Sequence, residues 1–149
     1  MEYDQSHINL QKIGFEGFIP IFSLRTNYNL IPKEKGVYII LYPFENIPKF
    51  KSTGSGGHFK GKNPNVAAEI LQNNWIKDEP IIYIGKAGSA SGSATLHSRL
   101  KQYLNFGKGK PVGHWGGRYI WQLDLPEDLI ICWKPTTEHD PSIIESYLI

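Results

Sequence analysis

The chain has 149 residues, 40% hydrophobic and 20% charged, which predicts one globular domain spanning 1–149 with a core of its own. Its single cysteine, Cys132, excludes a disulfide or a cysteine zinc site within the chain and favours a reducing, cytoplasmic setting. No apolar run approaches the roughly 20 residues of a membrane span, so no membrane partner is expected, and the formal net charge of +2 is too small to indicate a polyanionic partner by itself.

The first strongly patterned element is a strand at 36–42, where the run GVYIILY is almost wholly apolar and predicts a central place in a sheet. Residues 1–35 before it form an N-terminal extension, which we expect to add either a further strand or a clasp across the core. Residues 43–62 after it are rich in glycine, proline and lysine, a composition typical of a loop and, here, of a mobile excursion.

Residues 63–75 carry the signals of a helix. Asn63 can cap its N-terminus, and Pro64 suits its first position. The apolar residues that follow at helical spacing are Ala67, Ile70, Leu71 and Trp75. Together with the preceding loop, this helix makes up an insertion at 43–79 that precedes the next strand.

A second strand is predicted at 80–87, PIIYIGKA, whose apolar run indicates burial on both faces. The helix after it has Ser93 or Thr95 as its cap and ends near the glycines of 105–109. Its apolar stripe, which should face the sheet, consists of Leu96, Leu100, Tyr103 and Leu104.

Two more strands are predicted at 117–123 and 129–135, joined by a tight turn, and a last helix begins at Asp140 and Pro141. The order of these elements predicts an α+β fold, with a small central, mainly antiparallel β-sheet flanked by helices.

The distribution of charge is more informative than its sum. Residues 86–110 contain no acid and would present a positive surface if they fold onto one side of the domain, although a solvated polar segment is the simpler alternative. The basic residues of this segment are Lys86, His97, Arg99, Lys101, Lys108 and Lys110. Lys86 precedes Gly88 and Gly92, so the segment does not match a phosphate-binding loop, which needs lysine after its last glycine.

Polar residues that interrupt the apolar patterns form the candidate site. Tyr38 and Tyr83 lie within otherwise aliphatic strands, and neighbouring strands can bring two hydroxyls together. Arg99 and Tyr103 share one side of a helix, and Glu145 is an acid among the apolar residues of the last helix. Taken singly, each residue has an ordinary alternative, because tyrosines pack in cores, arginines reach past apolar surface to water and lone carboxylates are solvated.

As an ordered set, these residues are similar to the motifs of the GIY-YIG nuclease family. The chain has GVY at 36–38, YIG at 83–85 followed by KA, RLKQY at 99–103 and a late helix glutamate, Glu145. Lysine after the second motif, and a tyrosine four residues after the arginine, are common in repair and restriction members of that family. The resemblance covers roughly residues 36–149.

The resemblance implies a metal-dependent endonuclease that hydrolyses DNA phosphodiester bonds. Tyr38 and Tyr83 would flank the scissile phosphate, Arg99 would neutralise it, and Glu145 would hold one divalent cation, Mg²⁺ or Mn²⁺. Lys86 and Tyr103 would support that site. A cation beside a phenol favours its ionised form, so we expect Lys86 to activate Tyr83, and Gly85 to leave room for the DNA backbone.

Substrate-binding residues are expected outside the motifs. The segment GHWGGRYIWQL at 113–123 places His114 and Arg118 beside flexible glycines, and a histidine assists the site in some restriction-type members of the family. His97 and Lys101, from the basic segment, are the further candidates. Alternatively, the aromatic residues of 113–123 only cover the edge of the sheet and do not contact DNA.

The chain departs from the family pattern in three ways. The insertion at 43–79 separates motifs that usually lie close together, and it is a candidate for substrate selection. Val37 replaces isoleucine in the first motif, and the asparagine that usually follows the glutamate is absent, so we expect either a truncated sequence or an incomplete site. The alternatives are therefore a catalytically inactive nucleic-acid-binding domain and, more distantly, a binder of phosphate-containing small molecules. A homodimer is a candidate assembly, because cutting two strands often needs two subunits.

Overall fold

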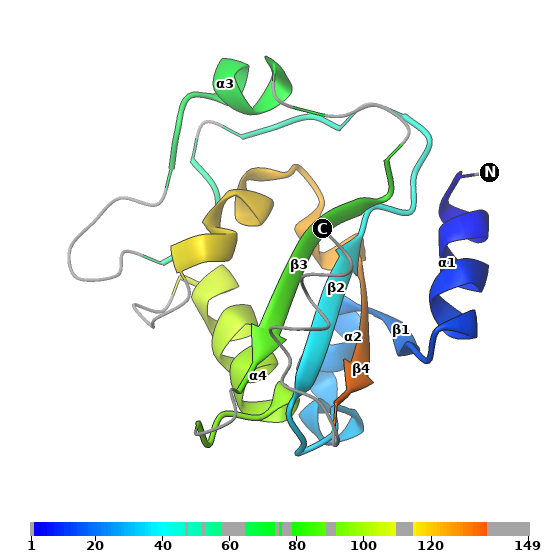
Figure 1. Ribbon diagram of the computed structural model, residues 1–149. Coiled ribbons are helices and arrows are strands. Elements are labelled where there is room, and N and C mark those ends of the chain that lie inside the picture. Colours follow the sequence, from blue (N-terminus) through cyan, green and yellow to red (C-terminus); the bar gives the residue numbers. More distant parts are fainter. Residues whose placement is uncertain are drawn as a thin grey trace.

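The structure of the protein is a computed structural model, and it describes residues 2–46, 48–51, 53–57, 65–73, 75, 79–88, 92–109 and 115–136. Within these residues, four antiparallel strands form one sheet in the order β1-β4-β2-β3, flanked by helices (Figure 1). The strands are β1 Glu16–Pro20, β2 Gly36–Leu41, β3 Ile81–Ala87 and β4 Ile130–Pro135. The helices are α1 Glu2–Lys12, α2 Ile21–Thr26, α3 Ala68–Asn73 and α4 Leu96–Gly107, with 3₁₀ helices η1 Tyr28–Leu30, η3 Trp115–Gln122 and η4 Pro126–Asp128. The predicted α+β class is confirmed.

The central strand β2 positions the first motif. All its residues are buried, and it pairs with β3 on one side and β4 on the other, as its continuous apolar run predicts. Because side chains alternate along a strand, β2 divides the core into two clusters. Tyr38 and Ile40 face α4, on the side that we call the tyrosine face, whereas Val37 and Ile39 face the opposite, aliphatic face.

Strand β3 corrects the expectation of burial on both faces. Its residues Ile81 to Ile84 are only half-buried. Among the described strands, β3 pairs with β2 alone and lies at the edge of the sheet. The apolar run thus identified the strand but not its position.

The N-terminal extension supplies the other edge of the sheet. Strand β1 pairs with β4, and α1 packs Leu10 against the aliphatic face, on the opposite side of the sheet from α4 (Figure 1). Of the two roles expected for residues 1–35, the further strand is therefore the one observed.

The predicted strand at 117–123 is wrong. Residues Trp115–Gln122 form the 3₁₀ helix η3, and an isolated bridge between Phe50 and Leu123 is the β-pairing found for this stretch in the described part of the chain. Strand β4, its expected partner, already has β1 on one side and β2 on the other. The predicted strand at 129–135 is confirmed by β4.

The helix predicted at 63–75 is shorter than expected, since α3 spans Ala68–Asn73. Residues just before it bond elsewhere: the Val66 N–H donates to the Gln122 side chain at 2.9 Å, and Asn65 Oδ1 accepts from the Gly54 N–H at 2.8 Å. The Val66 carbonyl accepts from the Gln122 amide at 2.7 Å, and the Ile70 N–H, which would be its donor in a helix, donates to the Ala67 carbonyl at 3.0 Å instead. The helix therefore begins after Val66.

The predicted excursion at 43–62 is docked at 49–51 and 53–57 and is not a free loop there. The Lys51 N–H donates to the Gln122 carbonyl at 2.7 Å, and the Gly57 N–H donates to the Phe106 carbonyl at 2.8 Å. The side-chain amide of Gln122, which is 1% exposed, donates to the carbonyls of Lys51 and Val66. One buried glutamine therefore ties two parts of the insertion to η3.

Helix α4 matches its prediction closely. Thr95 is the observed cap, and its hydroxyl accepts from the Ser98 N–H while Ser98 bonds back to Thr95. The helix buries the stripe predicted for it and covers the tyrosine face. The helix predicted from Asp140 lies outside the described residues. Among those residues, no helix is long and apolar enough to cross a membrane.

Candidate functional site

Three of the predicted tyrosines meet on the tyrosine face of the sheet. Tyr38 comes from β2, Tyr83 from β3 and Tyr103 from α4. Their ring centroids are 6.1 Å apart for Tyr38 and Tyr83, 6.4 Å for Tyr38 and Tyr103, and 5.9 Å for Tyr83 and Tyr103, which are stacked. We call this group the tyrosine cluster. Antiparallel pairing of β2 with β3 puts the two strand tyrosines on one face, and the buried stripe of α4 brings in the third.

Gly85 makes room for one member of the cluster. It pairs with Tyr38 across the β2–β3 ladder, and a Cβ atom at position 85 would overlap the ring and hydroxyl of Tyr38. The expectation that Gly85 leaves space for a DNA backbone is therefore corrected, because the phenol of the first motif fills that space. Packing of Tyr38, from the first motif, therefore requires glycine at position 85 in the second motif.

The three phenols differ in exposure. Tyr38 is 1% exposed and Tyr103 is fully buried, whereas Tyr83 is half-buried. Burial, followed by the neighbouring phenols of Tyr38 and Tyr83, raises the pKa of Tyr103 well above its ordinary value of 10.0. Tyr103 therefore keeps its proton at neutral pH, and Tyr83 is the member of the cluster that borders solvent.

Arg99 lies on the same side of α4 as Tyr103, one turn nearer the N-terminus. Its side chain is half-buried, and its Nη1 donates to Gln102 Oε1 at 2.7 Å. The guanidinium thus adjoins the buried stripe of α4, as the sequence predicts. This arrangement puts a permanent cation beside the helix residue that stacks on Tyr83.

Lys86 does not join the tyrosine face. It pairs with Val37, and strand alternation projects its side chain to the aliphatic face, opposite Tyr83. The expected activation of Tyr83 by Lys86 is therefore not supported by the geometry.

His97 and Lys101 also lie apart from the cluster. At 3.6 residues per turn, their directions around α4 differ from those of Arg99 and Tyr103 by about 120° to 160°. Lys101 Nζ lies 5.6 Å from the ring centroid of Tyr28. Burial, then the cations of Lys33 and Lys101, lowers the pKa of His97 below its ordinary 6.5. The positive charge of this separate surface therefore comes from Lys33 and Lys101, and His97 beside them is neutral at neutral pH.

The remaining predicted site residues are not placed against the cluster. Glu145 and His114 lie outside the described residues, and Arg118 falls within η3. Within the described ranges, no group of three or more His, Cys, Asp or Glu side chains is arranged to hold a metal ion. The predicted metal site depends on Glu145, and the structure leaves it untested.

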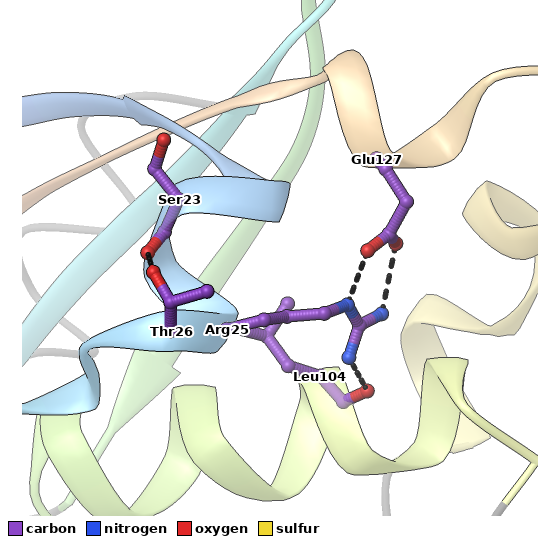
Figure 2. Close-up of polar contacts among 5 residues, drawn as sticks. All are labelled: Ser23, Arg25, Thr26, Leu104 and Glu127. Atoms are coloured by element: carbon purple, nitrogen blue, oxygen red, sulfur yellow. Dashed lines mark hydrogen bonds and ion pairs between the residues drawn. The ribbon is translucent and has the colours of Figure 1, made fainter.

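A network that the sequence did not indicate continues from the cluster. Tyr103 packs against Trp121 at 5.2 Å between ring centroids, and the Arg25 guanidinium lies 5.5 Å from the Trp121 ring. Figure 2 shows Arg25 clamped by the Glu127 carboxylate and by the Leu104 carbonyl, with Nη2 2.9 Å from Glu127 Oε2. Arg25 comes from the N-terminal extension and Glu127 from η4, so no local pattern relates them.

Comparison of the chain with protein-family models, with curated proteins and with solved structures found no match. The functional assignment therefore depends on the fold and on the chemistry of the site.

Proposed function

We propose that the protein is a metal-dependent endonuclease of the GIY-YIG type that hydrolyses DNA phosphodiester bonds. The observation that carries the proposal is the tyrosine cluster, in which Tyr38, Tyr83 and Tyr103 meet although they come from three separate elements. The ordered motifs that resemble the family predict this meeting, and simple packing of an α+β core does not require three phenols at one place.

The chemistry that we propose begins at Tyr83, the phenol that borders solvent. Its oxygen would orient the attacking water and accept a proton from it, a role that a nearby cation favours by stabilising the phenolate. Because Lys86 lies on the other face, Arg99 is the better candidate for that cation. Tyr103, whose pKa is raised by burial, would stay neutral, and together with Tyr38 it would hold the ring of Tyr83 in position.

Arg99 has a second task in this scheme. Negative charge grows on the phosphate oxygens as water attacks and on the leaving oxygen as its bond to phosphorus breaks, and a guanidinium placed beforehand stabilises that charge. Its bond to Gln102 restrains the side chain near the cluster. Fixing the group in advance reduces the reorganisation needed during the reaction.

The divalent cation of the proposal, Mg²⁺ or Mn²⁺, would be held by Glu145. Such ions prefer carboxylate, carbonyl and water oxygens, whereas the described cluster offers phenols and a guanidinium. When bound, the ion would supply positive charge to the phosphate. The steps assigned to Tyr83 and Arg99 do not depend on its geometry.

A second candidate function is a nucleic-acid-binding domain that keeps the fold but does not cleave. The burial of Tyr38 and Tyr103 favours it, because buried phenols can serve packing alone. For either function we propose a cytoplasmic location, consistent with the free, buried thiol of Cys132. A homodimer is proposed only for the nuclease, as a means of cutting both strands.

Cleavage of supercoiled plasmid with Mg²⁺ or Mn²⁺ tests the nuclease. We expect Tyr83→Phe and Arg99→Ala each to lower the rate by about 100-fold or more, because each removes a group that acts in the transition state. Two control variants, Tyr3→Phe and Lys12→Ala, should cleave like the wild type. Tyr3 is half-buried beside the aliphatic face, and Lys12 is exposed on α1.

The outcomes separate the two functions. DNA binding without cleavage by the wild type, or cleavage that survives both active-site changes, would refute the nuclease. Salt dependence then tests the binding domain, because phosphate contacts weaken steeply as salt rises. Linear product that appears together with nicked product, and increases with protein concentration, would support the dimer.

A further inference from the structure

A cavity of about 280 Å³ opens where the insertion leaves the sheet. It lies between residues 42–46 and 48–49, where the insertion begins, and residues 123–125 and 129, which precede β4. Its volume is close to the lower limit of roughly 300 Å³ for small-molecule sites. The lining residues that bear on its chemistry are Tyr42, Phe44, Asn46, Lys49, Asp124 and Leu125.

The walls of this cavity leave apolar surface open to water. Phe44 is 43% exposed and Leu125 is 61% exposed, and both line the same space. Phe44 meets Tyr42 edge to face at 5.4 Å between ring centroids, which fixes an aromatic wall. Exposed apolar side chains on the lining of one concave site are typical of a surface that a flat apolar ligand covers.

The polar groups of the cavity point to a ligand that also donates hydrogen bonds. Asp124 and Lys49 are exposed and form no ion pair with another described residue, and the Asp124 N–H donates to the Lys49 carbonyl at 2.9 Å, which ties the two walls together. The Tyr42 hydroxyl donates to the Asn46 carbonyl at 2.9 Å. Asn46 Oδ1 also lies within reach of this hydroxyl, at 3.5 Å. The groups left to recognise a ligand are therefore the Asp124 carboxylate and the Lys49 ammonium.

We propose that this cavity binds one nucleobase turned out of a DNA strand, with its ring against Phe44 and Leu125 and its exocyclic amino group donating to Asp124. The choice of a base among flat heterocycles rests on the proposed nuclease function. A carboxylate only accepts hydrogen bonds, so at the C4 position of a pyrimidine it favours the amino group of cytosine over the carbonyl oxygen of thymine. Lys49, at the same opening, suits the adjoining phosphate.

The cavity is set apart from the tyrosine cluster along one strand. Tyr42 and Tyr38 lie on the same face of β2 and its extension, four residues apart, which corresponds to about 13 Å at 3.3 Å per residue. This distance corresponds to about four steps of DNA at 3.4 Å each. The bound base would therefore help select the site of cleavage without taking part in the reaction, so the insertion would act in substrate selection.

Binding of two fluorescent hexanucleotides, dC6 and dT6, without metal ion tests the proposal. We expect dC6 to bind about tenfold more tightly than dT6, and Asp124→Asn to reduce that ratio to below about twofold, because an amide both donates and accepts. Phe44→Ala should weaken both by about tenfold through lost stacking. Phe22→Ala, a phenylalanine on α2 that is 52% exposed and does not line the cavity, should change neither affinity.

Equal binding of the two hexamers, or a preference that both Asp124→Asn and Phe44→Ala leave intact, would overturn the proposal. So would tight binding of an aromatic peptide with no binding of either hexamer. Because no metal or cleavage is involved, the two proposals fail separately. A cytosine preference without plasmid cleavage refutes the nuclease alone, and cleavage without the preference refutes the base site alone.

Discussion

The sheet with its covering helices and the insertion at 43–79 are held together by different interactions. In the sheet, which we call the frame, β2 is fully buried between two hydrogen-bonded neighbours. The insertion is attached through backbone groups of 49–51 and 53–57, through Trp75, which packs against Tyr42 and Phe50, and through Gln122. The frame is stabilised by contiguous apolar packing, and the described part of the insertion by backbone and side-chain hydrogen bonds and by two aromatic side chains, Phe50 and Trp75, that pack against the core.

This difference corresponds to a division of proposed roles. Groups that act on a reacting bond must be held within fractions of an ångström, which suits residues on strands and helices. The tyrosine cluster meets that requirement. Recognition of a nucleobase tolerates more adjustment and suits a loop supported by a scaffold. The cavity where the insertion begins is built in this way. The predictions below test the frame and the insertion in turn.

The largest effect is expected in the frame, from Gly85→Ala. The new methyl group would overlap the Tyr38 ring, which is buried and cannot move without disturbing Tyr83 and Tyr103. We expect the free energy of unfolding to fall by about 3 kcal/mol, at the upper end of overpacking effects. Urea denaturation measures it. Lys86→Ala, at the next position on the opposite face, should change stability by less than about 0.5 kcal/mol. Equal effects of the two changes would contradict the packing of Tyr38 on Gly85.

The next effect concerns the insertion. Gln122→Leu removes two donated hydrogen bonds and one accepted bond, and leaves the Val66 N–H and the carbonyls of Val66 and Lys51 without that partner. We expect a loss of about 2 kcal/mol, together with faster proteolytic cleavage within 49–57, because the loop detaches while the sheet stays folded. Limited proteolysis followed by mass spectrometry locates the cuts. The exposed Gln5→Ala on α1 is the control. A uniform loss of stability with unchanged cleavage sites would show that the insertion and the frame unfold as one unit.

The sequence predicted the frame better than the insertion, for a physical reason. Strands β2 and β3 can be predicted from their local apolar runs, and helix α4 from its helical periodicity and its capping box. Strand β1 does not, because EGFIP contains glycine and proline and is a strand only through its pairing with β4, more than a hundred residues away. The stretch 117–123 has a strand-like composition, but the edges of β4 are already occupied.

The site was predictable in part. The meeting of the three tyrosines is what the ordered motifs predict. The two misplaced cations, Lys86 and Lys101, could have been recognised from their distances along the sequence. Tyr83 and Lys86 are three residues apart, an odd number that separates their side chains across a strand. Likewise, Arg99 and Lys101 differ by two residues, which places them on different sides of a helix. The Arg25–Glu127 pair and the cavity were not predictable, since they join segments that only the tertiary fold brings together.

The smallest effect, in the frame again, is a pH dependence from Cys132 on the aliphatic face. Burial raises the pKa of its thiol from 9.0 to about 12. The unfolded chain therefore loses this proton at lower pH than the folded chain, so the stabilisation is complete below pH 9 and is lost as pH rises from 9 toward 12. Between pH 9 and pH 10, this thiol alone should lower the free energy of unfolding by about 1 kcal/mol.

Urea denaturation at pH 8, 9 and 10, with Cys132→Ala beside the wild type, measures this contribution together with its coupling to Tyr3, whose pKa is raised by burial and then by Cys132. The variant has a cavity and is less stable at every pH, but its stability should fall by about 1 kcal/mol less than that of the wild type between pH 9 and pH 10. Tyr103, whose pKa is also raised, contributes equally to both proteins at these pH values and cancels in the comparison. Parallel pH profiles for wild type and variant would mean that the thiol reaches water, and that the aliphatic face of the frame is less tightly closed than the tyrosine face.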